Sequence, residues 1–308
     1  MFNKKISSIL IKENSPSHQD IEFVNSNISG DIRLFIDPVL IEVGKTDFCT
    51  KAKLVLDDFF KEFYKAYFID NDNTRKKDLL SHAKEINDSH MGYANKYGHG
   101  NTDDGLMKIF SGVEDYIKRI KISRIFELVL FVPNFAEDGM SDLITNVLYK
   151  ELSDFTLKIC QKYKIKTSMC PDERYYWSYQ THNWEKYTGH SLVVEGKSHL
   201  LIPKEIVQKN FKFTVDNYLR SVIVQNICDD AAYYDNTTKK EIRPLAKEKV
   251  REQLIQKYGS ALEIIKDFSE KNENLLKQYQ TIVTNKYSAL QLSDNELDVT
   301  VYGSKLDT

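Results

Sequence analysis

The most constraining feature of the chain is a hydrophobic pattern in residues 133–163. From Leu143 to Tyr163, apolar residues recur at steps of three, four and seven positions, which places them along one stripe of a helix. Ser141 precedes the series, and a serine there can cap a helix by accepting an orphan backbone N–H. A helix of about 22 residues spans roughly 33 Å, about the width of a small domain. The sequence therefore predicts a central helix from Ser141 to Tyr163 with its apolar side in a core.

The first turn of this helix is acidic. Asp138 and Asp142 lie where the positive end of the helix dipole favours negative charge, so they are interpreted either as simple capping residues or as a metal or substrate site. Asp142 directly precedes the apolar stripe, and we expect its carboxylate to face a cleft formed with the loop 87–105. Thr145 and Asn146 are one turn further along and can share these surroundings.

Composition excludes several classes of protein. The 308 residues are 41% hydrophobic and 29% charged, with a net charge of −2, so overall charge gives no argument for nucleic acid, although a local basic face is compatible with it. The longest apolar runs are shorter than the roughly 18 residues that a membrane span needs. The four cysteines are scattered, without a CxxC pattern. We therefore expect a cytoplasmic protein with reduced thiols and no structural zinc.

The remaining patterns predict an α+β fold in which helices pack on a small mixed sheet. The β-rich run Ile32–Ile36 reads as a buried strand, and the runs 190–194 and 198–202 read as a hairpin around a Glu-Gly-Lys turn. Helices are expected from residue 50 to about 68, from 105 to 121 and from 213 onward, with a strand or short helix at 125–132. The predicted sheet contains Ile32–Ile36, Leu192–Val194 and Leu200–Ile202, covered by helices that begin near residues 50, 141 and 215.

The C-terminal part differs in character from the rest. Residues 238–290 are rich in charge, have helical periodicity and are interrupted at Gly259. We divide the chain into an α+β core domain at 1–235 and a charged helical region at 236–308. The helical region is interpreted as a helical hairpin or a partner-binding arm, and the run LDVTVYG near the end as a short strand.

Two irregular stretches are candidates for ligand binding. The loop 87–105 contains four glycines with His90 and His99, so its backbone N–H groups are candidates for a phosphate cradle; plain loop roles are the alternative. It matches neither GxGxxG nor a P-loop. The stretch 167–190 places Arg174 among several aromatic residues, including Trp177. These residues either stack bases or partner groups, or form a structured loop packed on the core.

The most specific catalytic pattern is that of a divalent-metal nuclease. Such sites combine an acid with a Glu-x-Lys: the acids hold the metal that activates water, and the lysine stabilises the transition state. Glu195-Gly196-Lys197 has this local form, and Asp142 or Asp138 would supply the other acid for Mg²⁺. The alternative is that Glu-Gly-Lys is simply the turn of the hairpin. The substrate-binding candidates in this reading are His99, Thr145, Asn146, Arg174 and Trp177.

Three blocks of sequence resemble an uncharacterised bacterial protein family associated with phage-defence loci, often near ATPase genes. The blocks are FIDPVLIE at 35–42, EDGMSDLITNVL at 137–148 and HLLIPKEIV at 199–207. The resemblance implies that Asp142, Thr145 and Asn146 act together. Met140 stands where a basic residue would be expected.

Two functional hypotheses follow. In the first, the chain is a component of a prokaryotic antiviral defence system that acts on or senses nucleic acid, as a metal-dependent nuclease in its sharpest form. In the second, it is a non-catalytic adaptor or regulator whose region 238–290 binds a partner ATPase or another subunit of the defence system. Oligomerisation is compatible with both.

Overall fold

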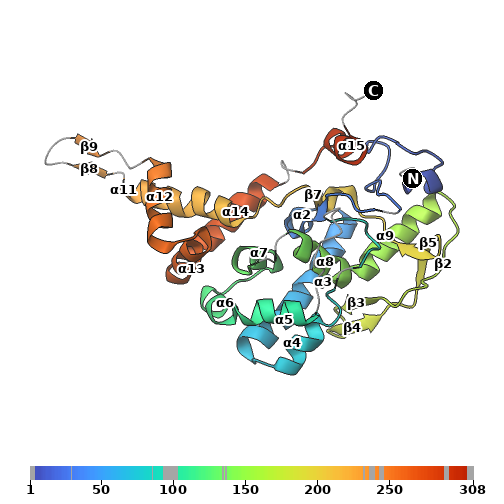
Figure 1. Ribbon diagram of the computed structural model, residues 1–308, viewed down its shortest axis with the longest axis horizontal. Coiled ribbons are helices and arrows are strands. Elements are labelled where there is room, and N and C mark those ends of the chain that lie inside the picture. Colours follow the sequence, from blue (N-terminus) through green and yellow to red (C-terminus); the bar gives the residue numbers. More distant parts are fainter. Residues whose placement is uncertain are drawn as a thin grey trace.

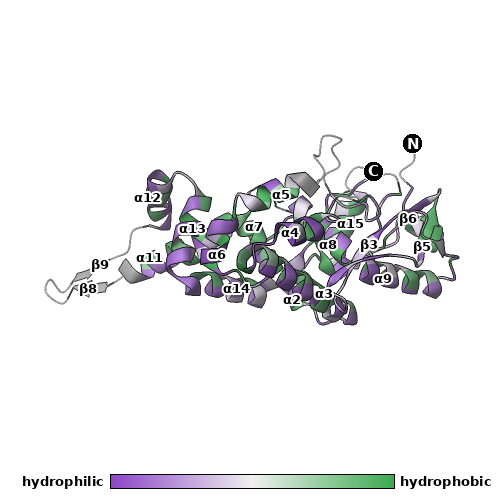
Figure 2. Ribbon diagram, turned by 90° about the horizontal axis from the view of Figure 1, so that it is seen from below, coloured by the Kyte–Doolittle hydropathy of each residue, from purple (hydrophilic) through white to green (hydrophobic). Residues whose placement is uncertain are grey.

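The computed structural model describes residues 4–28, 30–84, 86–92, 103–133, 135, 137–231, 233–235, 240–242, 246–287 and 291–303. The protein combines helices with several short antiparallel strand pairs, so the α+β fold class is confirmed (Figure 1). The C-terminal helices are present too. The molecule is elongated: the helices Lys247–Tyr258 and Ala261–Lys271 lie toward one end, and the strands β5 (His190–Val194) and β6 (Lys197–His199) lie at the other (Figure 2).

The predicted central helix is present but is divided in two. Helix α8 spans Glu137–Val147 and helix α9 spans Tyr149–Lys162, with the backbone of Leu148 between them outside helical geometry. Ser141 does not cap a helix, because α8 begins four residues earlier. Its buried Oγ instead accepts the backbone N–H of Ile36 at 3.0 Å. The expected boundary is therefore wrong, and this serine ties α8 to the strand at Phe35–Ile36.

The apolar stripe of these two helices is core, which gives a direct test. Leu148 is fully buried, so Leu148→Ala should lower the free energy of unfolding by at least about 2 kcal/mol. Phe155 is only half-buried, with its ring edge-on to Phe48 at 6.0 Å, so Phe155→Ala should cost less. Urea denaturation against the exposed control Lys158→Ala measures both. A Leu148 variant as stable as that control would contradict the assignment of the stripe to the core.

The strands form separate small sheets. Strand β1 (Phe35–Ile36) pairs with β7 (Val207–Gln208), and β5 lies between β2 (Ser168–Met169) and β6. The expectation that Ile32–Ile36 shares a sheet with the hairpin is wrong. Asp37 caps the next helix through a hydrogen bond from the Val39 N–H and so ends the first strand, which begins at Phe35 and not at the expected Ile32.

The hairpin itself is confirmed. Its turn places Glu195 at φ 52° and Gly196 at φ 80°, which is the pattern of the two-residue turn that matches strand twist. A second hairpin, β3 (Tyr175–Ser178) with β4 (Asn183–Lys186), occupies the stretch read as an aromatic loop. The tryptophans Trp177 and Trp184 face each other across it, with their rings 5.7 Å apart.

The helices of the first half enclose an aromatic core. Helix α3 (Asp47–Tyr64) continues as a π-helical turn, Lys65–Ile69, and its Phe59 and Phe63 are buried. The region 125–132 is helical rather than a strand. The remaining helices of this half are α1 (Ser7–Leu10), α2 (Pro38–Val43), α4 (Asn73–Leu80), α5 (Asp103–Ser111), α6 (Glu114–Ile120), the 3₁₀ turn Ile125–Glu127 and α7 (Leu128–Phe131).

The charged C-terminal region is helical and breaks at Gly259, as predicted, where φ is 83°. The elements before this region are the 3₁₀ turn Lys204–Ile206, α10 (Val215–Tyr218), the π-helical turn Leu219–Ile223, α11 (Val224–Ala231) and the hairpin of β8 (Tyr233–Asp235) and β9 (Lys240–Ile242). The helices that follow are α12 (Lys247–Tyr258), α13 (Ala261–Lys271) and α14 (Glu273–Tyr287). Hydrophilic residues are prominent on α12 (Figure 2). In Figure 1, β8 and β9 extend beyond these helices.

The end of the described chain is a helix, α15 (Asp294–Tyr302), so the expectation of a strand there is wrong. Ser293 and Glu296 form a capping box at its start. The helix lies beside the N-terminal segment (Figure 1), where Asp298 receives a hydrogen bond from His18 Nδ1 at 2.6 Å. The backbone N–H of Asn25 donates to the other ring nitrogen of His18, and this fixes the neutral tautomer with its proton on Nδ1.

Candidate functional site

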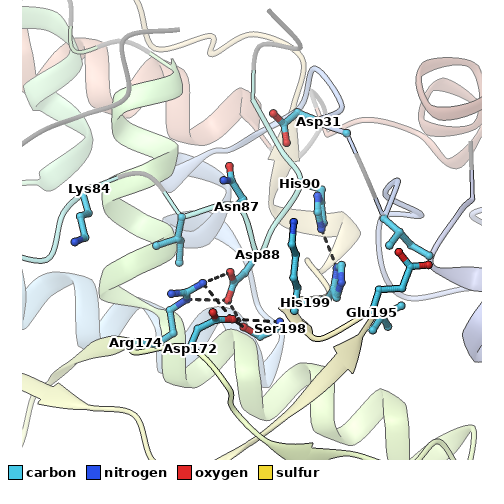
Figure 3. A pocket seen from close by; sticks show the side chains of 15 residues that line it. Asp31, Lys84, Asn87, Asp88, His90, Asp172, Arg174, Glu195, Ser198 and His199 are labelled. Carbon is cyan, nitrogen blue, oxygen red and sulfur yellow. Dashed lines mark hydrogen bonds and ion pairs between the residues drawn. The ribbon is translucent and has the colours of Figure 1, made fainter. Parts of the chain in front are cut away.

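A polar cavity of about 610 Å³ lies where residues 28, 30–31, 84 and 86–90 meet the β5–β6 hairpin (Figure 3). Its size suits a ligand of about the bulk of a nucleotide. Its charged and polar lining side chains are Asp31, Lys84, Asn87, Asp88, His90, Asp172, Arg174, Glu195, Lys197, Ser198 and His199.

Asp88 lies at the centre of a hydrogen-bond network that forms the floor of the cavity. Its carboxylate is buried and receives two hydrogen bonds from Arg174, at 2.7 Å from Nη2 and 3.0 Å from Nε. The hydroxyl of Tyr149 lies 3.0 Å from Oδ2 and that of Ser198 lies 2.9 Å from it. Burial works against the charged guanidinium, but the bonds to Asp88 raise the pKa of Arg174. A bidentate pair with further donors holds its geometry well, so this floor is rigid.

Asp172 extends the network toward the cavity mouth. Its Oδ2 lies 2.8 Å from the Ser198 hydroxyl and 3.6 Å from Nη2 of Arg174. Burial opposes ionisation, but hydrogen bonds from Ser198 hold the pKa of Asp172 below its usual value. Because Ser198 has one hydroxyl proton and two carboxylates within reach, it serves as a donor between acids and not as a nucleophile.

Two histidines form the other wall. Nε2 of His90 lies 2.8 Å from Nδ1 of His199, and the rings are stacked with centroids 4.9 Å apart. His90 has a left-handed backbone, with φ 53°, an uncommon conformation for a non-glycine residue. Burial, together with His199, lowers the pKa of His90 to about 4, and burial also lowers the pKa of His199. Both rings are therefore neutral at physiological pH.

Which ring donates in this contact depends on the tautomers of the two histidines. Nε2 of His199 is buried without a hydrogen-bond partner in the described part of the chain, and the nearby Val194 carbonyl opposes the effect of burial on its pKa. A proton on that nitrogen leaves Nδ1 of His199 to accept from the Nε2–H of His90. The remaining nitrogen of His90, Nδ1, then carries a lone pair at the cavity wall.

The rim carries charges of both signs. Lys84 and Lys197 contribute the cations, and Asp31 and Glu195 the acids. Burial and then the neighbouring Asp138 raise the pKa of Asp31. Glu195 is 70% exposed and lies 3.8 Å from Nζ of Lys4. The rim can therefore contact a ligand that carries both phosphate and hydrogen-bonding groups.

The structure brings together some of the residues singled out from the sequence. Glu195, Lys197 and Arg174 line the cavity, although the guanidinium of Arg174 is directed to Asp88. Asp138 does not line the cavity but lies near Asp31, which does, and Asp138 contributes to the raised pKa of that carboxyl. In the described segments no group of three His, Cys, Asp or Glu side chains is arranged to hold a metal ion.

The residues of the central helix support the cavity from behind. The side-chain amide of Asn146 donates to the backbone carbonyls of Lys84 at 2.7 Å and Asp142 at 2.9 Å, and so anchors the start of the cavity segment. Thr145 is buried and donates to the Ser141 carbonyl. None of Asp142, Thr145 and Asn146 lines the cavity. The predicted contact of Asp142 with 93–102 falls outside the described residues, as does His99.

Trp177 is buried and does not line the cavity. Its ring is 1% exposed, its Nε1 donates to Asp58 at 2.8 Å, and it meets the Phe59 ring edge-on. The alternative reading, an aromatic element packed on the core, is the correct one. The physical reason is the hairpin β3–β4, which turns this face of its strands inward.

Several cavity residues were not identified from the sequence. Asp88, Asp172 and the adjacent pair Ser198 and His199 lie in three short stretches, and none of these four residues was singled out as a site residue. A partial signal was present, because His90 belongs to a glycine-rich loop and His199 lies on the strand that follows the Glu-Gly-Lys turn. Nothing local indicates that these two histidines meet.

The structure thus defines an α+β domain with a polar, histidine-containing cavity. The chain belongs to the family described as a domain of unknown function (DUF8370), whose model matches residues 14–214. This match spans every residue that lines the cavity and ends before α10. No curated protein and no solved structure matches the chain. In the part of the chain that the structure describes, every helix is too short or too polar to cross a membrane.

Proposed function

We propose that the chain is a cytoplasmic component of a prokaryotic antiviral defence system and that it binds nucleic acid, or a nucleotide derived from it, in the His90–His199 cavity. The observation that carries the proposal is the combination of a fixed histidine pair with Lys84 and Lys197 in one cavity of nucleotide size. Lysines neutralise phosphates, and the lone pair on His90 can accept a hydrogen bond from a base or a ribose hydroxyl.

A phosphate beside His90 would change its protonation. A nearby negative charge stabilises imidazolium, so the pKa of His90 should rise from about 4 when the ligand binds. Protonation then favours the bound state, and affinity should increase as pH falls from 8 toward 5. In the ligand-free protein, His90 has so low a pKa that it is a weak base near pH 7. A weak base is poorly suited to activate water by itself, so the cavity favours a sensing role over cleavage when no metal is added.

A fluorescein-labelled single-stranded oligonucleotide tests the proposal by anisotropy. We expect Lys84→Gln combined with Lys197→Gln to weaken binding about tenfold, since two phosphate contacts are lost. The control Lys286→Gln removes an exposed cation on α14 and should leave affinity unchanged. His90→Asn, which tolerates the left-handed backbone, should flatten the pH dependence. Equal affinities for the cavity variant and the control would contradict the proposal.

The catalytic form of the proposal requires a metal. The same oligonucleotide is incubated with the protein and Mg²⁺ or EDTA, and the Glu195→Gln variant is run beside the wild type. Cleavage that needs both Mg²⁺ and Glu195 would support a nuclease. Binding without cleavage under every condition would favour a nucleic-acid sensor over a nuclease.

The adaptor function is the second candidate, and one observation favours it. Helices α12–α14 lie beyond the family match and form one end of the molecule (Figures 1 and 2). An arm of this kind can hold an ATPase subunit without chemistry of its own. A chain that binds no oligonucleotide, yet elutes together with a partner ATPase, would support the adaptor over the nucleic-acid-binding protein.

A further inference from the structure

A second hollow, here called the α3 groove, lies between the end of α3 with its π-helical turn and the segment 122–124. Its volume is about 430 Å³. The groove shares no lining residue with the His90–His199 cavity. Its apolar lining residues are Phe60, Tyr64, Ile69 and Ile122, and its charged ones are Asp57, Lys61, Lys65 and Arg124.

The apolar part of the groove reaches solvent. Ile69 is 64% exposed, one of few large aliphatic side chains so exposed in the described segments, and Phe60 and Ile122 form a buried floor next to it. Ile69 closes the π-helical turn Lys65–Ile69. Turns of this kind interrupt α-helices at a cost in regular hydrogen bonding and are frequent at functional sites. An exposed isoleucine beside a hollow with an apolar floor fits a docking surface.

The charges around this floor are mainly positive. Lys61 makes no ion pair with any described residue, and Lys65 is 3.9 Å from Asp70, a distance at which two exposed side chains interact weakly. Nε of Arg124 lies 3.5 Å from Glu42. The one acid that lines the groove is Asp57. Glu42 and Asp57 lie close to Arg124, so the positive charge that the groove offers a ligand lies at Lys61 and at the weakly paired Lys65.

We propose that the α3 groove docks an acidic amphipathic helix of a partner protein. One or two apolar side chains of that helix would sit against Phe60 and Ile69, and its carboxylates would face Lys61 and Lys65. Apolar contact supplies affinity in helix-in-groove recognition, and complementary charge supplies orientation and selectivity. The partner is thus distinguished from a nucleic acid, which has no aliphatic side chains to cover Ile69.

The test uses the full chain and a synthetic helical peptide of leucine and glutamate, labelled with fluorescein. The matched probe has lysine in place of every glutamate. We expect the glutamate peptide to bind and the lysine peptide to bind at least tenfold more weakly. Ile69→Glu, and separately Lys61→Glu with Lys65→Glu, should each reduce binding of the glutamate peptide at least tenfold.

Leu54→Glu is the matched control, because Leu54 is an exposed aliphatic residue on the same helix that does not line the groove. All of these positions are exposed, and a thermal melt confirms that each variant is folded. Equal binding of the two peptides, or an Ile69 variant indistinguishable from the Leu54 control, would overturn the proposal. Displacement of the peptide by an oligonucleotide, with the same sensitivity to Lys61 and Lys65, would also overturn it and assign the groove to nucleic acid.

Discussion

Replacement of Arg174 by methionine should lower the free energy of unfolding by about 3 to 5 kcal/mol, because it leaves a buried carboxylate without its cation. The Asp88 side chain is 4% exposed, and Arg174 contributes both of its charged hydrogen bonds. Tyr149 and Ser198 still donate to Asp88 in the variant, but neutral donors do not replace a positive charge. Chemical denaturation at neutral pH measures the loss.

Two comparisons make this prediction specific. Asp88→Asn with Arg174→Met removes both charges and should recover much of the stability that Arg174→Met loses. Arg119→Met breaks an exposed ion pair with Glu270 and should cost less than about 1 kcal/mol. An Arg174 variant no less stable than the Arg119 variant would show that the Asp88–Arg174 ion pair does not stabilise the floor of the cavity.

The same variants separate two roles of Arg174. The sequence suggested that this residue contacts substrate, whereas its guanidinium is occupied by Asp88. As a positioning residue, it should change oligonucleotide binding only through the geometry of the floor. The double variant Asp88→Asn with Arg174→Met should therefore retain more affinity than the double variant at Lys84 and Lys197, whose ammonium groups lie on the rim.

Periodicity and turn chemistry account for what the sequence predicted well. The aromatic face of 50–68, the break at Gly259 and the hairpin around Glu195 are all local patterns, and each is present in the structure. One pattern is ambiguous, because two different causes produce the same sequence. Glu-Gly-Lys is the form of a nuclease motif and of a turn that needs positive φ at two positions, and the backbone at Glu195 shows the turn.

The candidate site was less predictable because its contacts are long-range. His90 and His199 are separated by 109 positions, and Asp88 and Arg174 by 86. Single-sequence patterns carry no information about such pairs. The helix at 294–302, in contrast, could have been predicted from a local pattern, because Ser293 and Glu296 have the spacing of a capping box. Its alternating valines instead suggested a strand.

Glu127 carries a large expected dependence of stability on pH. This glutamate is fully buried, and its Oε2 accepts the backbone N–H groups of Ser123 and Arg124. Its other oxygen, Oε1, is buried without a partner in the described part of the chain. Burial raises the pKa of Glu127 from 4.5 to about 7, although the two backbone hydrogen bonds oppose this shift. The folded protein therefore holds a proton that the unfolded chain releases.

The direction of the effect follows from that difference. Below pH 4.5 both states are protonated, and the carboxyl group carries no penalty. Between pH 4.5 and about 7 the unfolded state ionises first, so stability falls as pH rises. Above the folded pKa the loss is complete, at about 3 kcal/mol, since each pKa unit corresponds to about 1.4 kcal/mol.

Glu127→Gln tests this assignment, because glutamine resembles the protonated acid and keeps an oxygen for the two backbone donors. Urea denaturation at pH 5 and pH 8 should show that the wild type loses about 2.5 kcal/mol more than the variant over this range, because part of the total loss has already occurred at pH 5. Glu151 also has a pKa raised to about 7 by burial, but its contribution is common to both proteins and cancels in the difference. If both proteins lost the same stability between pH 5 and pH 8, Glu127 would be ionised in the folded state, and an unseen cation or water would have to satisfy Oε1.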